Sequence, residues 1–120
     1  MDRAMATEYR RVLMGLVSMV IDWYGRDGQC VPSVYDSKVV YRRRHDEVFR
    51  PPWVALAEGD ADAAELVVWR VAELRSMFRS GRERATIRVE WGSSFCLVLV
   101  RRADGTIEDP VVVLRERAAL

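Results

Sequence analysis

The chain has 120 residues, half of them hydrophobic and 31% charged, and its formal net charge is +1. This composition is typical of one folded domain over residues 1–120, and it excludes a disordered chain, which combines low hydrophobicity with high net charge. A nearly neutral chain has no long-range attraction for DNA or acidic membranes, so such binding would need local segregation of charge.

Cysteine content and the N-terminal residues indicate the compartment. Cys30 and Cys96 are the only cysteines, and the first residues lack the apolar core and cleavage site of a secretory signal. The longest apolar run, around residues 12–21, is too short to span a bilayer. We therefore expect a cytoplasmic protein with reduced thiols and no membrane partner. The arginine excess, with Lys38 the only lysine, is typical of a high-GC genome.

Residues 5–24 are predicted to form the first helix. Apolar side chains recur at three-and-four spacing, which builds one apolar face. They are Met5, Tyr9, Val12, Leu13, Leu16, Val17, Val20, Trp23 and Tyr24. Met14 and Ile21 widen the apolar zone beyond one stripe. Two interpretations stay open: the helix is central to the core, or it packs against a second copy in a homodimer.

The middle of the chain reads as strands followed by a loop. Gly25 and Gly28 end the first helix, and residues 29–41, rich in β-branched and aromatic side chains, predict two short strands divided near Asp36. The arginine-rich stretch Tyr41–Trp53 follows and ends at Pro51 and Pro52, where a regular helix or central strand cannot continue.

A second helix is predicted over residues 62–80. Asp62 and Glu65 form the pattern of a capping box, and Gly81 is a typical stop. The predicted buried face consists of Ala63, Val67, Val71, Leu74 and Phe78.

The remainder predicts three antiparallel strands. Residues 86–91 alternate between apolar and polar side chains, whereas residues 95–100 are apolar on both faces, which predicts a central strand covered on both sides. Residues 103–105 predict a tight hairpin, and residues 107–114, with Pro110 inside, an edge strand with a bend. The last residues are predicted to be a frayed tail or a short helix.

The predicted order is therefore α-β-β-α-β-β-β. Two helices packed on one face of a twisted, mainly antiparallel sheet would bury the apolar side of every segment. We predict an α+β fold.

The stretch Tyr41–Trp53 is the first candidate site. Arg42, Arg43, Arg44 and Arg50, interleaved with aromatic residues that include Trp53, would suit phosphates and stacked bases. Asp46 and Glu47 offset this charge, and no nucleic-acid-binding motif accompanies it. Three interpretations stay open: a solvated loop, a contact with a protein partner, and a nucleic-acid site.

Trp69 is the second candidate. A helical wheel places it among Glu65, Glu73 and Ser76, opposite the predicted buried face. An indole on a polar helix face is typical of an interaction site, unless a neighbouring segment covers it.

No pattern predicts catalysis or a bound group. His45-Asp46 are adjacent residues that face one another poorly, Cys30 lacks a nucleophile signature, and one histidine with two distant cysteines does not make a metal site. The acidic residues 58–65 are interpreted as helix caps and solubilising charges.

We therefore predict a non-catalytic protein-binding domain of the inhibitor, immunity, chaperone or accessory-subunit type, without cofactor or metal. Its expected partner-binding residues are Trp69, Arg42, Arg43, Arg44, Arg50 and Trp53. The alternative is a nucleic-acid-binding protein that uses Tyr41–Trp53.

Overall fold

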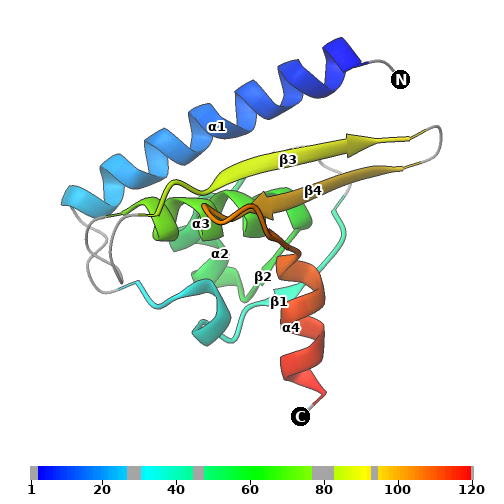
Figure 1. The fold of residues 1–120 in the computed structure, drawn as a ribbon. Helices are drawn as coiled ribbons and strands as arrows, with labels where there is room; N and C mark the ends of the chain where they lie inside the picture. The colour runs from blue at the N-terminus through cyan, green and yellow to red at the C-terminus, as the bar shows by residue number, and fades with distance from the viewer. Residues whose placement is uncertain (1–2, 27–30, 45–47, 77–82, 93–94, 120) are drawn as a thin grey trace.

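Residues 3–26, 31–44, 48–76, 83–92 and 95–119 are described by a computed structural model of the chain. Their elements are α1 (Arg3–Arg26), the 3₁₀ turn η1 (Val34–Asp36), β1 (Val40–Tyr41), α2 (Pro52–Glu58), β2 (Asp60–Ala61), α3 (Ala63–Arg75), β3 (Thr86–Trp91), β4 (Cys96–Arg101), β5 (Ile107–Glu108) and α4 (Pro110–Ala118). Figure 1 shows the arrangement of these elements.

The predicted α+β architecture is confirmed. The long helices α1 and α3 pack on each other and on the antiparallel sheet β3-β4-β5 (Figure 1). The core between them includes Leu13 and Val17 of α1 and Ile87 and Val100 of the sheet. Arg10 of α1 also donates a hydrogen bond to the carbonyl of Ile87, 2.7 Å away, which ties the helix to β3.

The capping box at the start of α3 is also confirmed. The Asp62 carboxylate accepts a hydrogen bond from the Glu65 backbone N–H, and the Glu65 carboxylate accepts one from the Asp62 N–H, both at 2.9 Å. These bonds satisfy two backbone donors that a helix start leaves unpaired. The helix ends at Arg75, five residues earlier than predicted. Phe78, Ser80 and Gly81 lie outside the described residues.

The middle of the chain differs from the prediction. Instead of two strands over residues 29–41, it contains η1 and the two-residue β1, which pairs in parallel with β2. Helix α2 was not predicted. The proline pair, interpreted as a barrier to helices, instead starts one, because Pro52 occupies the first helical position, where its missing N–H costs nothing. Gly59, with φ of 86°, then ends α2 in the left-handed region.

The C-terminal segment needs the same correction. The predicted strand over residues 107–114 is limited to β5, and Pro110 begins α4 rather than bending an edge strand. The Asp109 side chain accepts a hydrogen bond from the Val111 N–H at 3.0 Å and caps this helix. The hairpin between β4 and β5 forms as predicted, with Gly105 at φ of 89°.

Strand β4 is central in its sheet, as predicted, but it is not covered along its whole length. Val98 and Val100 lie in the core, whereas Leu97 is exposed. Opposite Leu97 and Leu99, β3 carries Glu90 and Arg88, so charged side chains share this outer face. This outer face is therefore open at Leu97 but covered at Leu99, which is buried.

Candidate protein-interaction surface

Trp69 is buried, which corrects the prediction of an exposed indole. Its exposed fraction is 1%, and its predicted polar neighbours Glu65, Glu73 and Ser76 are buried as well. The segment around η1 contacts the same side of α3: the Val34 N–H and the Ser33 hydroxyl both donate hydrogen bonds to the Glu73 carboxylate. Helix α3 is therefore enclosed on the side that its wheel marks as polar. Trp69 cannot be a contact residue for a partner.

Arg50 is buried too, and it holds the fold together. Its backbone N–H and guanidinium donate hydrogen bonds to Glu65 at 2.6–3.2 Å. The same guanidinium pairs with Asp60 at 2.8 Å and with Glu58. The carboxylates that were interpreted as solubilising charges thus surround one arginine. Arg50 joins the start of α3 to α2 and β2 and is unavailable to a partner.

The other residues of the stretch do not form one site. Arg44 is mostly buried and pairs with Glu65 at 3.0 Å, while the exposed Arg42 pairs with Asp60 at 3.3 Å. Arg43 is exposed. Trp53 is partly exposed and stacks on Trp23 of α1, with ring centroids 4.3 Å apart. His45, Asp46 and Glu47 lie outside the described residues. The stretch therefore presents far less positive charge than its sequence indicates.

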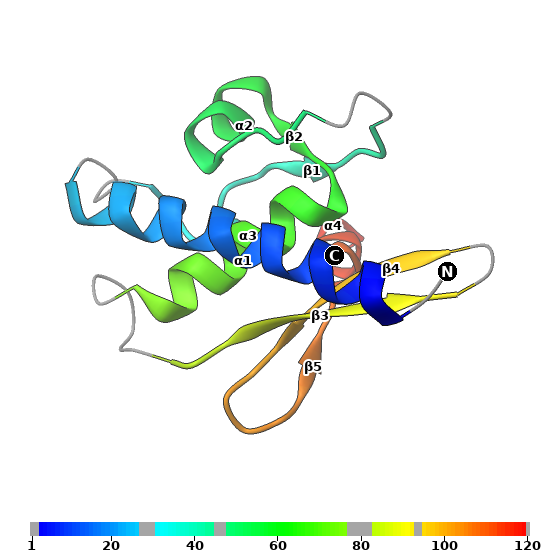
Figure 2. The same ribbon diagram turned by 90° about the horizontal axis from the view of Figure 1, so that it is seen from above.

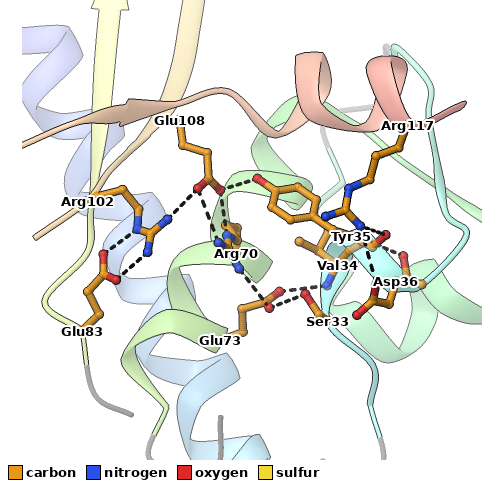
Figure 3. Close-up of polar contacts among 11 residues, drawn as sticks. Ser33, Val34, Tyr35, Asp36, Arg70, Glu73, Glu83, Arg102, Glu108 and Arg117 are labelled. Atoms are coloured by element: carbon orange, nitrogen blue, oxygen red, sulfur yellow. Dashed lines mark hydrogen bonds and ion pairs between the residues drawn. The ribbon is translucent and has the colours of Figure 1, made fainter. Parts of the chain in front are cut away.

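A second ionic network was not predicted and joins η1, α3 and the sheet (Figure 3). Glu108 of β5 accepts from Arg70 at 2.7 Å, from Arg102 at 3.0 Å and from the Tyr35 hydroxyl. Arg102 also pairs with Glu83 at 2.6 Å. Burial by itself would raise the pKa of Glu108, but these donors lower it below its ordinary value.

The same network commits Tyr35 to a structural role. Arg70 lies over its ring at 4.7 Å from the centroid, and burial together with the bond to Glu108 raises the pKa of its hydroxyl. A phenol held in its neutral form by a carboxylate is a donor, not a base. Each carboxylate drawn in this network faces an arginine (Figure 3). We therefore interpret the cluster as a structural network that holds η1, α3 and the sheet together.

Described residues also line hollows on the surface, and two of these bear on the choice of a binding site. One, of about 460 Å³, lies between β1 and α4 and is lined by Tyr35, Lys38, Val39, Val40, Tyr41, Leu114, Arg115, Arg117 and Ala118. Its tyrosine rings carry stacked guanidinium groups, with Arg115 5.1 Å from the Tyr41 centroid and Arg117 5.3 Å from that of Tyr35. Arg117 is held further by the Tyr35 carbonyl at 3.2 Å and by Asp36 at 3.5 Å. These cations therefore already have partners within the chain.

The other hollow is a mainly apolar groove beside α1, of about 580 Å³. It is lined by Tyr9, Val12, Leu13, Leu16, Val48, Phe49, Asp62, Ala64, Glu65, Trp91 and Cys96. Its two carboxylates are the caps of α3, and burial raises the pKa of Asp62. Burial also raises the pKa of the Cys96 thiol, which makes it a weak nucleophile. Most of the residues that line this groove are apolar or aromatic.

One wall of the groove continues as an apolar row along α1. We call this row the α1 seam and define it as Met5, Tyr9, Val12, Leu16, Met19 and Trp23. Met5, Val12 and Met19 are 50%, 59% and 43% exposed, and the other three are half-buried. The core is made instead by Leu13, Val17, Val20 and Tyr24.

The wide apolar zone of α1 therefore contains a buried row and the α1 seam, in which Met5, Val12 and Met19 are exposed and the other three residues pack partly against the core. From the sequence, this helix could be central to the core or meet a second copy, and its apolar residues formed one undivided zone. The spacing of the apolar residues along the helix distinguishes the two rows. The seam advances by four, three, four, three and four residues, which is the repeat of a helix that packs against another helix.

Comparison with known proteins supplies no further constraint. No protein-family model matches the sequence, and searches of curated proteins and of solved structures found no similar chain. None of the described helices combines the length and the apolar character needed to cross a membrane. The described residues also contain no group of three or more His, Cys, Asp or Glu side chains that could hold a metal ion.

Proposed function

We propose that the protein is a non-catalytic protein-binding domain, and that its binding face is the α1 seam with the adjoining apolar groove. The observation that carries this proposal is the exposure of Val12 and Met19 in a regular apolar row. Exposed apolar residues scattered singly are ordinary, but a contiguous row at helix-packing spacing is typical of an interaction surface. Trp53, stacked on Trp23, adds a partly exposed aromatic at one end of this face.

The chemistry of the groove supports binding rather than turnover. Its carboxylates are bonded to backbone donors at the start of α3, so they anchor the fold. Partial desolvation raises the pKa of its Cys96 thiol although the residue is exposed, and a raised pKa makes a thiol a weaker nucleophile at neutral pH. The remaining lining is apolar or aromatic, which suits a side-chain-to-side-chain contact. A cytoplasmic location stays a prediction that the two-cysteine content supports.

The nucleic-acid alternative loses its main support. Arg50 and Arg44, two of the four arginines on which it rests, are bonded to Glu65 within the chain, and Arg42 pairs with Asp60. Buried arginines that are bonded to a carboxylate of the fold do not reach a phosphate, so only the exposed Arg42 and Arg43 remain for such a contact. We therefore place the partner-binding surface on α1 and propose a protein as the partner.

An affinity experiment tests this proposal. The purified wild-type protein and a Val12→Glu variant are immobilised, exposed to an extract of the native host, and compared by quantitative mass spectrometry. Val112→Glu is the matched control, because Val112 is also an exposed valine, 44% accessible, on α4. Helix α4 lies on the opposite side of the molecule from α1 (Figure 1).

We expect the proteins captured by the wild type to be lost with Val12→Glu and kept with Val112→Glu. Equal capture by all three proteins, at equal folded fraction by circular dichroism, would sink the proposed surface. Charged substitution at an exposed helix position changes stability little, about 0.5 kcal/mol or less, so folding does not confuse the comparison.

A further inference from the structure

We infer that the occupant of the α1 seam is a second copy of this chain, with the two α1 helices packed antiparallel about a two-fold axis. The inference rests on the proposed function and names its partner. Its support is the order of residues along the seam, the space at the helix centre and the charge beside it.

The seam is symmetric about its own midpoint. Its positions run 5, 9, 12, 16, 19, 23, so reversing the helix about residue 14 exchanges 5 with 23, 9 with 19 and 12 with 16. In heptad terms, Tyr9, Leu16 and Trp23 occupy one core position and Met5, Val12 and Met19 the other. Antiparallel helices bring these two kinds of position face to face. The seam therefore matches a reversed copy of itself in register.

Side-chain size also favours the reversed arrangement. In each layer one larger or stiffer residue meets a smaller or more flexible one: Trp23 meets Met5, Tyr9 meets Met19, and Leu16 meets Val12. Methionine adapts its shape to an aromatic ring and makes favourable sulfur contacts with it. A parallel pair would set Trp23 against Trp23 and Val12 against Val12, which alternates crowding with gaps.

Gly15 lies beside the centre of the seam and allows close approach. It is three residues from Val12 and four from Met19, so it shares their side of the helix. Nothing lies within 4 Å of the position that a Cβ would take there. Glycine in a helix interior destabilises it by about 0.5–1 kcal/mol relative to alanine. An open glycine at the point where two reversed helices cross lets their backbones come together.

Glu8, Gly15 and Asp22 share one edge of α1, so the reversed arrangement brings Glu8 of one copy near Asp22 of the other, and each carboxylate carries an arginine on its own helix. Glu8 pairs with Arg11 at 3.3 Å and Asp22 pairs with Arg26 at 3.1 Å, each on its own helix. The border of the seam is thus close to neutral at both ends. Figure 2 shows α1 as the layer nearest the viewer, with no other element in front of it. Val12 and Met19, which are 59% and 43% exposed, are the seam residues near the helix centre that a second helix can reach.

The size of the contact sets the expected strength. A helix of 24 residues is about 36 Å long and 10–12 Å wide with its side chains, less contact area than the ~800 Å² per partner of a standard interface. Trp53 and Val48 stand beside the seam and extend the apolar surface. We expect a dimer with a dissociation constant on the order of 1–100 µM.

Sedimentation equilibrium over a concentration series measures this association. The wild type is expected to shift from monomer to dimer, while Val12→Arg weakens association by about tenfold or more, because the two-fold axis introduces two buried charges for one substitution. Val112→Arg on α4 is the control and is expected to match the wild type. A wild type that stays monomeric up to millimolar concentration overturns the inference, as does a dimer that Val12→Arg leaves intact.

Cross-linking tests the direction of the helices. In a background with Cys30→Ser and Cys96→Ser, single cysteines are introduced as Gly15→Cys or Met19→Cys and treated with a short bismaleimide. About a two-fold axis at residue 14, the two copies of position 15 are offset by about 3 Å along the helices, and those of position 19 by about 15 Å. We expect a cross-linked dimer from Gly15→Cys only. Efficient cross-linking from Met19→Cys overturns the antiparallel arrangement.

The two proposals fail in different ways. Should the chain remain monomeric while capture of other host proteins still depends on Val12, the dimer is wrong and the protein-binding surface stands. Should neither self-association nor capture respond to Val12, both proposals are wrong.

Discussion

The arginine-rich stretch buries a charged side chain, whereas the first helix exposes apolar side chains. In the stretch, Arg50 is buried with its guanidinium shared by three carboxylates. In α1, Val12 and Met19 stand in solvent although both are apolar. Some charged residues that the sequence predicts to be exposed are therefore buried, and some apolar residues that it predicts to be buried are exposed.

This difference shows what decides burial in a small domain. A charge can be buried when the fold supplies matching charge and hydrogen bonds, and Glu65 does so for Arg50 and Arg44. An apolar side chain is buried only if another element covers it. The described elements cover the row of α1 that contains Val17 and Val20 and only part of the α1 seam, so that Met5, Val12 and Met19 stay exposed. An exposed apolar row is then the stronger pointer to a partner.

The largest expected effect is at Trp69. Trp69→Ala removes a fully buried indole and should lower the free energy of unfolding by about 3–5 kcal/mol. Chemical denaturation monitored by circular dichroism measures this change. The indole N–H has no hydrogen-bond partner among the described residues, so Trp69→Phe is the control and should retain most of the stability. A near-neutral Trp69→Ala would mean that this residue is not in the core.

Arg50 should come next. Arg50→Ala leaves Glu65 buried without its main partner, and removing one member of a buried ionic cluster costs about 3 kcal/mol. The matched control is Arg43→Ala, an exposed arginine of the same stretch, with an expected change within about 0.5 kcal/mol. Denaturation midpoints of the two variants compare them directly. If Arg43→Ala proved the more damaging, the inward orientation of Arg50 would be refuted.

Acid titration tests the second ionic network. Because the pKa of Glu108 is lowered in the folded state, its ionised form stabilises the protein at neutral pH. The stability difference between wild type and Glu108→Gln should be about 2 kcal/mol at pH 7. It should shrink as the pH falls through about 4.3, the ordinary glutamate value, and vanish below the lowered folded pKa. Denaturation midpoints of both proteins between pH 7 and 3 measure it, and a difference that grows on acidification would reverse the sign.

The smallest effect concerns two glycines. Gly15→Ala should stabilise the monomer by about 0.5–1 kcal/mol, because alanine is the better helix former and its methyl group meets no neighbour. Gly59→Ala should do the opposite, since Gly59 has a φ of 86° that alanine adopts only under strain. Thermal melts at low protein concentration, where dimers are dilute, separate these effects from association. Destabilisation by Gly15→Ala under these conditions would mean that the helix centre is not open.

Local patterns predicted a large part of this fold. The periodicity of α1, the capping box of Asp62 and Glu65, the alternation of β3 and the hairpin at Gly105 are properties of neighbouring residues, so they can be read before any packing is known. The prolines were harder, because Pro52 and Pro110 fit both a strand edge and a helix start. In the structure, each of these prolines is the first residue of a helix, because the residues that follow it are helical.

The candidate site was predicted only in outline. The apolar excess of α1 and its possible role in a homodimer were visible in the sequence, but the division into an inner and an outer row required the positions of α3 and β3. Trp69 and Arg50 were assigned to the surface because a helical wheel or a charge run contains no information about distant segments. Residues 58–65 contain as many acidic residues as residues 42–50 contain arginines, and this match was the one feature of the sequence that indicated ion pairs between the two segments.

By itself, then, the sequence determined the class of fold, the main helices and strands and the surplus of apolar surface on the first helix, since these follow from residues a few positions apart. Tertiary structure alone decided which charged side chains form ion pairs within the chain and which apolar side chains of the first helix stay exposed. The physical reason is that burial depends on partners brought together across the whole chain: Arg50 finds Glu65, fifteen residues away, and Val34 covers α3 through Glu73, thirty-nine residues away.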